Sequence, residues 1–220
     1  MPALVKLRAR TSYVDEVYQS LLGAISEGRL APGERITQED IAEQLSVSRS
    51  PVLQALGLLK KDGLVQDAPG RGLQVAPLDA TWTCKIYEVR GALDALAAKL
   101  AAARGFKVDP QLIANGRKAA KSGDVKAMID ADIDFHRAIY DAADNPLLSD
   151  TVRLHWVHLR RVMGAALQSA AQRSTIWDEH EAIANALEKG NGDEAARLAE
   201  LHIQNARAGV IKRMGWQLPD

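Results

Sequence analysis

Four side chains that can bind a metal lie where the C-terminal half of the chain should have apolar core residues. They are Asp132, His136, His180 and His202. Asp132 and His136 continue an apolar stripe with spacings of three and four, which is typical of one face of an amphipathic helix, and they project side by side. His180 and His202 interrupt two later helical stripes in the same way. A buried carboxylate is costly unless it is paired or bound to a metal, so we expect one shared cation.

A single inward histidine is more often a hydrogen-bonded core residue than a metal ligand, and this interpretation stays open for each of the three imidazoles. Four interruptions of separate apolar stripes favour the metal. Neutral imidazoles and one carboxylate suit Zn²⁺, Ni²⁺, Fe²⁺ or Mn²⁺, and the sequence does not select among these divalent ions. Four protein ligands would nearly close a tetrahedral zinc site, whereas an octahedral metal would keep positions open for water or a ligand.

Arg90 interrupts a further helical stripe, between Ile86 and Leu93, so its guanidinium is expected to face the same helical bundle. It could hold an anionic ligand through paired hydrogen bonds. It could equally form a salt bridge to Asp132, Asp134 or another acid. Both interpretations stay open.

Three more side chains lie on helical stripes near this group of residues. His155 and His158 either line a ligand pocket or form hydrogen bonds within the core. Trp177, three residues before His180, is either part of a pocket wall or a plain core residue.

The elements that would position these side chains are helices. The C-terminal part reads as six helices, at about 82–104, 110–122, 124–143, 146–170, 173–189 and 192–213, separated by Gly, Asn-Pro and Asp-Pro punctuation. A bundle of this size can bury a real core. We therefore expect an all-helical domain over residues 79–220, after a break near residues 77–82.

Residues 1–78 instead predict three short helices followed by a hairpin. The first helix runs from about Tyr13, with Thr11 or Ser12 as its N-cap, and Thr37 opens the second with a capping-box-like pattern. Ser48 caps the third, which ends at Gly63. Three helices and a hairpin describe a winged helix-turn-helix, although a docking domain of similar shape is an alternative.

The chain as a whole has no basic excess that would favour nucleic acid, since 28 basic and 28 acidic residues cancel among its 220. The third helix, however, contains Arg49, Lys60 and Lys61 and no acid. DNA contacts are expected from Ser48, Arg49 and Ser50 at its start, and from Arg71 and Gly72 at the hairpin tip. The single cysteine, Cys84, and the lack of a signal-like or membrane-spanning apolar run lead us to expect a cytoplasmic protein with no membrane partner.

The run LAPGERITQEDIAEQLSVSRSPVLQALGLLKKDGLVQDAPGRGLQV resembles the DNA-binding domain of GntR-type bacterial transcription regulators. The PGERI turn, the VSRSPV start of the recognition helix and the GLV and GRGLQV segments of the wing carry the resemblance. One departure is Leu53-Gln54, where the family usually has Arg-Glu. That family arginine commonly touches DNA, so the operator sequence does not carry over.

The C-terminal half resembles the ligand-binding domain of the FadR-type branch of that family, in its six-helix version. Asp132-x-x-x-His136, the later Asn145-Pro146, His180 and His202 match its pattern. The resemblance implies that these four residues bind a divalent metal and that a small carboxylate effector completes the coordination. It also implies that Arg90, in YEVRGALD, contacts this carboxylate. Asp94 stands where relatives usually have Glu.

Together these features predict a dimeric transcription regulator, acting as a repressor, which reads an inverted repeat in double-stranded DNA and responds to a small organic acid. The alternative is a metal-dependent hydrolase that uses the Asp/His site, with Asp134 or Glu179 as general base. A DNA-reading domain would be surplus to such an enzyme, and no HExxH motif is present. A third interpretation, a metal-free regulator that binds acyl-CoA, is disfavoured by the intact quartet.

Overall fold

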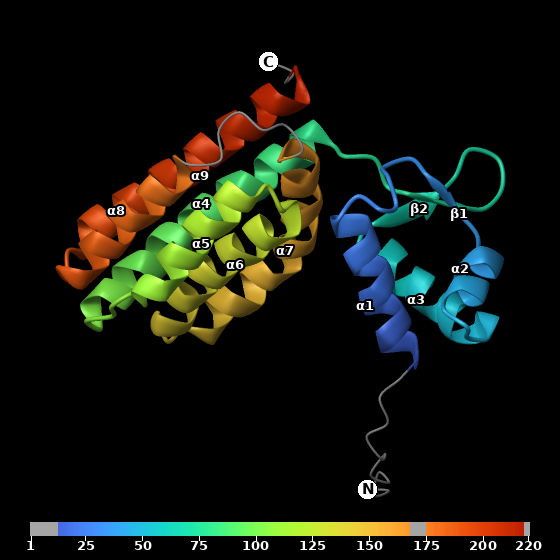
Figure 1. Cartoon of the computed structure of the whole chain (residues 1–220), viewed down its shortest axis with the longest axis horizontal. Coiled ribbons are helices and arrows are strands. Elements are labelled where there is room, and N and C mark those ends of the chain that lie inside the picture. The colour runs from blue at the N-terminus through green and yellow to red at the C-terminus, as the bar shows by residue number, and fades with distance from the viewer. Residues whose placement is uncertain (1–12, 168–174, 218–220) are drawn as a thin grey trace, which may run out of the picture. The chain divides into compact units, whose positions relative to one another are not determined.

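The structure, a computed structural model, describes residues 13–167 and 175–217. Its contacts divide the chain into two compact units, Met1–Pro77 and Leu78–Asp220 (Figure 1). The expected fold class is confirmed: a winged helix-turn-helix is followed by an all-helical bundle. None of the described helices is long and apolar enough to cross a membrane.

The N-terminal unit contains α1 (Tyr13–Ser26), α2 (Gln38–Gln44) and α3 (Arg49–Lys61). Thr37 opens α2 as expected, because its hydroxyl accepts a hydrogen bond of 3.2 Å from the backbone N–H of Asp40. Ser48 is the N-cap residue of α3, as expected, and its side chain makes no capping hydrogen bond. The exposed hydroxyl is therefore available to another partner. The expected N-cap of α1, Thr11 or Ser12, lies outside the described residues.

A three-stranded antiparallel sheet closes this unit, in the order β1 (Arg35–Ile36), β3 (Leu73–Val75), β2 (Val65–Asp67). The hairpin of β2 and β3 is the expected wing. β1 was not expected, because two residues carry no alternating pattern. Gly70 and Gly72 have φ of 92° and 96°, so the tight turn at the wing tip requires residues that tolerate the left-handed region.

The C-terminal unit contains α4 (Ala80–Ala103), α5 (Pro110–Ser122), α6 (Val125–Ala142), α7 (Pro146–Ala166), α8 (Ile176–Glu188) and α9 (Gly192–Met214). Short polar side chains open five of them by accepting a hydrogen bond from a backbone N–H of the first turn; they are Asp79, Asp109, Asp124, Asn145 and Asn191. The expected end of α7 at residue 170 and the expected start of α8 at residue 173 fall outside the described residues.

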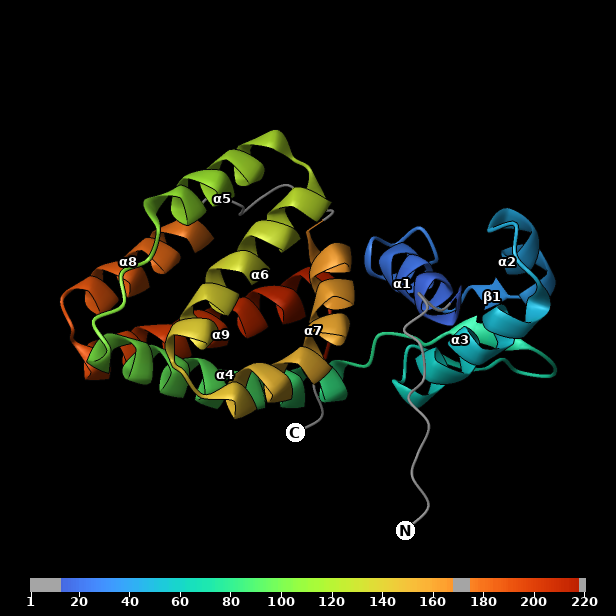
Figure 2. The ribbon, with the colours of Figure 1, turned by 90° about the horizontal axis from the view of Figure 1, so that it is seen from below.

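The two longest of these helices, α4 and α9, run antiparallel and side by side (Figures 1 and 2). Ion pairs from Glu88 to Arg207 and from Lys99 to Asp193 fix this direction. α6 packs against α4 and carries Phe135, whose side chain is fully buried. Burial of an aromatic side chain of this size contributes about 1.5–3 kcal/mol to folding. The core therefore holds α6, α8 and α9 in place around the histidines.

Candidate metal centre

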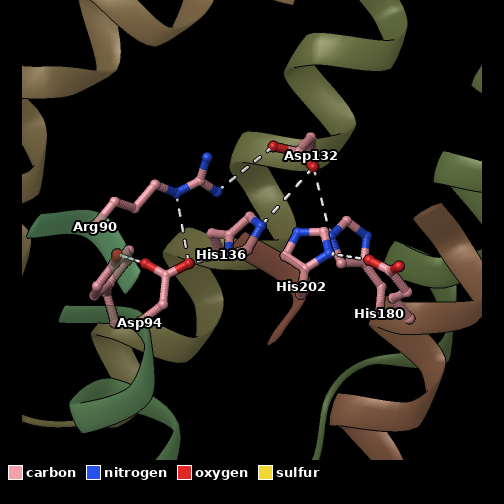
Figure 3. Close-up of polar contacts among 8 residues, drawn as sticks. Arg90, Asp94, Asp132, His136, His180 and His202 are labelled. Carbon is pink, nitrogen blue, oxygen red and sulfur yellow. Dashed lines mark hydrogen bonds and ion pairs between the residues drawn. The ribbon is translucent and has the colours of Figure 1, made fainter. Parts of the chain in front are cut away.

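The structure brings Asp132, His136, His180 and His202 together in the interior of the helical unit (Figure 3). One ligand atom from each lies within 4.8 Å of all the others, and all four residues are buried. We call these four residues the Asp/His cluster. Asp132 and His136 come from α6, His180 from α8 and His202 from α9, so three helices must pack correctly to form it.

The imidazole Nε2 atoms of the cluster point toward one another and toward one carboxylate oxygen. Nε2 of His180 lies 3.2 Å from Nε2 of His202 and 3.5 Å from Oδ1 of Asp132. Nε2 of His136 lies 3.8 Å from the same oxygen. Three nitrogens and one oxygen that converge in this way form a donor set that suits a divalent transition metal.

Two further carboxylates contact the Nδ1 atoms of two histidines, on the side of each ring that faces away from the centre of the cluster. Oδ2 of Asp94 lies 3.1 Å from Nδ1 of His136, and Oε2 of Glu179 lies 2.7 Å from Nδ1 of His202. The other Glu179 oxygen accepts a hydrogen bond of 2.8 Å from Asn205. A carboxylate accepts from a protonated Nδ1, which leaves the lone pair of Nε2 directed at the centre of the cluster. The sequence reasoning missed this role of Asp94 and Glu179.

Arg90 is buried on α4 beside the cluster. Its Nη2 lies 3.8 Å from Oδ2 of Asp132, its Nε lies 3.5 Å from Oδ2 of Asp94, and its Cζ lies 4.5 Å from the ring centre of Trp156. These ion pairs are too long to be hydrogen bonds, and Nε and Nη2 have no hydrogen-bond partner among the described residues. The salt-bridge interpretation of Arg90 is therefore confirmed. Its unpaired N–H groups can still donate hydrogen bonds to a further anion.

Asp134, which was named as a possible partner of Arg90, points elsewhere. Its carboxylate accepts a hydrogen bond of 2.8 Å from Arg137. Asp94 is the carboxylate that takes its place, and it also accepts a hydrogen bond from the hydroxyl of Tyr140.

The electrostatics of the site keep the imidazoles of His136 and His180 neutral and the carboxylate of Asp94 charged. Burial lowers the pKa of His180 well below its ordinary value, and repulsion from His202 and His136 adds to this. Burial and the charge of Arg90 also lower the pKa of His136. Burial alone would raise the pKa of Asp94, but attraction from Arg90 and hydrogen bonding from His136 and Tyr140 reverse this and lower it. Neutral imidazoles beside carboxylates are the protonation states that metal binding needs.

One atom of the cluster tests whether a cation fits. Nε2 of His136 faces the centre of the cluster, is buried and has no hydrogen-bond partner within the described part of the chain. Such an atom left unpaired costs about 1–3 kcal/mol. A cation at the centre of the cluster would bind this nitrogen together with Oδ1 of Asp132, so the residues present fit a bound metal.

A cavity of about 60 Å³ lies against the cluster, and Arg90, Asp132 and His202 form part of its wall. Trp177 lines it too, while its ring packs edge-on against His180 with 4.6 Å between ring centres. Trp177 is therefore both a buried residue and a wall residue. His155 and His158 do not line this cavity, and burial lowers the pKa of His155.

The residues expected to touch DNA lie on the surface of the N-terminal unit: Ser48, Arg49, Ser50, Arg71 and Gly72. Leu53 and Gln54, the departure from the family pattern, are exposed as well. Arg35 donates hydrogen bonds to the carbonyl oxygens of Pro69, at 2.6 Å, and Arg71, at 3.5 Å, so β1 supports the wing tip.

Comparison with known proteins identifies a family for each of the two units. Residues 13–75 match the family model described as bacterial regulatory proteins, gntR family, and residues 85–205 match the FCD domain. The HTH-type transcriptional regulator LutR of Bacillus subtilis (strain 168) is 30% identical over 210 residues, covering 82% of this chain and 93% of LutR. The "Probable D-xylose utilization operon transcriptional repressor" of Paenarthrobacter nicotinovorans is 26% identical, covering 92% of this chain and 91% of the relative. The solved structure of E. coli McbR/YncC has the same fold, with a TM-score of 0.78 at 22% identity over 93% of this chain and 100% of that one.

The gntR family model and both relatives are described as regulators of transcription or bacterial regulatory proteins, so the hydrolase alternative has no support. The GntR match covers the winged helix-turn-helix, and the FCD match covers the helices that carry the Asp/His cluster. The chain belongs to the GntR family of bacterial regulatory proteins, with an FCD domain after its DNA-binding unit, and is a transcription regulator.

Proposed function

We propose that this regulator is a repressor whose binding to its DNA operator is controlled by a small carboxylate. The carboxylate would bind at a divalent metal in the Asp/His cluster. The observation that carries the proposal is the convergence of four buried ligand atoms next to a cavity. Arg90 supports it, because its guanidinium borders the same cavity and retains unpaired N–H groups. The relative from Paenarthrobacter nicotinovorans, which is named as a probable transcriptional repressor, favours repression.

Asp132, His136, His180 and His202 would hold the metal, and Zn²⁺, Ni²⁺, Fe²⁺ or Mn²⁺ would each suit them. A bound metal supplies a positive centre for carboxylate oxygens. Arg90 would bind and orient the same carboxylate through charge-assisted hydrogen bonds. Asp94 and Glu179 would keep the imidazole rings in position.

Elemental analysis tests the metal. We expect about one divalent ion per chain in the wild type and a clear loss in Asp132→Asn, which keeps the shape of the side chain while removing its charge. His155→Gln, a change in a half-buried histidine outside the cluster, is the matched control and should retain the metal. Equal metal content in all three proteins, or none in the wild type after gentle purification, would refute the proposal.

The DNA-binding part of the proposal assigns operator contact to Ser48, Arg49 and Ser50 at the start of α3, and to Arg71 and Gly72 on the wing. Their exposure supports this assignment. A helix N-terminus with hydroxyl and guanidinium groups suits phosphates and base edges. Two copies of the chain would read two half-sites of an inverted repeat.

A dimer is supported by an apolar stripe on α4. Trp82, Val89 and Leu96 follow one another at intervals of seven residues, and they are 52%, 46% and 44% exposed. Large apolar side chains at this interval form the seam between paired helices. We propose that a second copy of this chain covers the stripe.

Selection of duplexes from a random-sequence pool tests the operator prediction. The selected sites should contain two inverted half-sites, with centres about 10 base pairs or a multiple of that apart. Selected sites with one half-site only, or with two in direct repeat, would contradict a symmetric dimer. Release of the selected duplex by a carboxylate in metal-loaded protein, with no release after chelation, would support effector control.

A further inference from the structure

A second arginine, Arg213 near the end of α9, lines the same cavity as Arg90. Arg90 faces two carboxylates, whereas Arg213 forms no ion pair or hydrogen bond with any residue that the structure describes. Its guanidinium lies back along its own helix, 3.9 Å from the point where a Cβ on Gly209 would stand. The cavity therefore has a positive group without a negative partner.

This second charge lies well away from the Asp/His cluster. Gly209 is seven residues beyond His202 on α9, and a helix rises about 1.5 Å per residue, so the guanidinium of Arg213 lies about 10 Å along the helix from His202. Tyr87 on α4 lines the same cavity and interacts with the charges of both Arg90 and Arg213, and its hydroxyl has no hydrogen-bond partner in the described ranges. Burial raises the pKa of Tyr87 to about 12, so the hydroxyl remains a donor at neutral pH.

Apart from Tyr87 and the charged or metal-binding side chains, the cavity wall is apolar. Met163, Leu167, Ala206 and Val210 all line the cavity. A ligand that satisfies both ends needs two anionic groups separated by carbons, because polar groups in its middle would lose water without gaining partners. A polyhydroxylated acid would meet this penalty along its whole length.

We propose that the effector is a linear dicarboxylate, with one carboxylate at the cluster and Arg90 and the other at Arg213 and Tyr87. The inference rests on the proposed function and names the ligand class of the same site. The helical rise of about 10 Å between the level of His202 and that of the Arg213 guanidinium sets the scale of the ligand. Roughly 2 Å of it belongs to a metal–oxygen contact and roughly 3 Å to a guanidinium–oxygen contact. The remaining length fits a dicarboxylate of about four or five carbons.

Calorimetric titration of metal-loaded protein tests this length and charge pattern. Succinate and glutarate are the probes, and butyrate and valerate are their matches with one carboxylate removed. We expect the dicarboxylates to bind at least about tenfold more tightly, because a charge-assisted contact at Arg213 is present only for them. Arg213→Gln should remove most of this preference, and Arg213→Lys should restore part of it.

Lys212→Gln is the matched control, because Lys212 is an exposed basic residue beside Arg213 that does not line the cavity. It should retain the full preference. A wild type that binds valerate as tightly as glutarate, or a preference that survives Arg213→Gln, would overturn the dicarboxylate inference and leave the metal-bound carboxylate standing. An Arg213-dependent preference that persists in metal-free protein would uphold the inference and refute the role of the metal. Failure of all four acids to bind would overturn the dicarboxylate inference, and elemental analysis of the same samples would show whether the metal site stands without it.

Discussion

The histidines of the Asp/His cluster are positioned by charged neighbours as much as by packing. Asp94 faces Nδ1 of His136 at 3.1 Å, and Glu179 faces Nδ1 of His202 at 2.7 Å. Phe135 stacks on the ring of His180, with 4.2 Å between ring centres. Each ring is thus restrained by a different contact, and restrained rings lose little entropy when they bind an ion.

The buried imidazoles predict a pH dependence of stability in metal-free protein. Burial lowers the pKa of His136 and His180, so these side chains bind a proton near pH 6.5 in the unfolded chain but not in the folded one. The stability that depends on their neutral state is fully present above about pH 6.5 and is lost as the pH falls toward their folded pKa values. We expect a lower urea midpoint at about pH 5.5 than at about pH 7.5, in low and in high salt alike. A midpoint that is unchanged or rises on acidification would contradict this.

Arg49 is the side chain whose removal should most affect DNA binding. It pairs with Glu39 at 3.0 Å, but both groups are exposed, and such pairs contribute only about 0–1 kcal/mol. Glu39 therefore does not prevent Arg49 from reaching a base. Arg49→Ala should weaken binding to a selected operator by about 1–3 kcal/mol, measured by gel shift or anisotropy. Arg153→Ala, a change in an exposed arginine of the helical unit, should bind as the wild type does. Equal binding by both variants would show that the assignment of Arg49 is wrong.

Among the helices, α5 and α8 depend on one glycine for their contact. Gly116 on α5 lies against Trp177 on α8, and a Cβ at position 116 would overlap the tryptophan ring. Because Trp177 packs on His180 and lines the cavity, Gly116 sets the position of one wall of the site.

Gly116→Ala should therefore disturb both stability and binding. We expect a loss of about 1–3 kcal/mol in the free energy of unfolding from overpacking, together with weaker metal retention. Gly23→Ala is the control, because its Cβ would meet only the flexible end of Arg29 at 3.9 Å. This change should be neutral or stabilising by up to about 1 kcal/mol. Similar melting temperatures for the two variants would indicate that Trp177 moves aside freely.

Period and punctuation were sufficient to predict the helices, because most of them bury one face and six of those described begin at a side chain that accepts a first-turn N–H. α4 begins two residues before its expected start, since Asp79 accepts the N–H of Trp82 at 2.8 Å. Sequence spacing also identified all four residues of the Asp/His cluster, because each interrupts an apolar stripe. Arg213 gave no such signal: a basic residue in the last turn of a helix is ordinarily explained by the helix dipole.

The role of Asp94 and Glu179 in orienting histidines could not be predicted from the sequence. Each lies on a different helix from the histidine that it orients, and only the packing of α4 on α6 and of α8 on α9 brings the pairs together. β1 was missed for a related reason, because its two residues become a strand only by pairing with β3. These features depend on tertiary contacts that no local pattern specifies.

For the assembled regulator, the stripe of Trp82, Val89 and Leu96 on α4 predicts the oligomeric state. We expect the wild type to have the mass of a dimer in analytical ultracentrifugation. Val89→Glu combined with Leu96→Glu should shift it toward the monomer, because charges facing each other across an apolar seam are unfavourable.

Leu147→Glu provides the control for that experiment. Leu147 is 73% exposed on α7, away from the stripe in sequence and on another helix, so its replacement should leave the dimer intact. A monomeric wild type, or a double variant with the mass of the wild type, would rule out the stripe as the interface.

The depth of the cluster has a consequence for the order of binding. Its four residues are at most 6% exposed, and the cavity lined by Asp132 and His202 lies directly against them. An acid that fills this cavity would stand between the metal and the solvent. If the proposed site is correct, the metal must therefore enter before the acid and can leave only after it. The acid would then slow the loss of the metal from the protein.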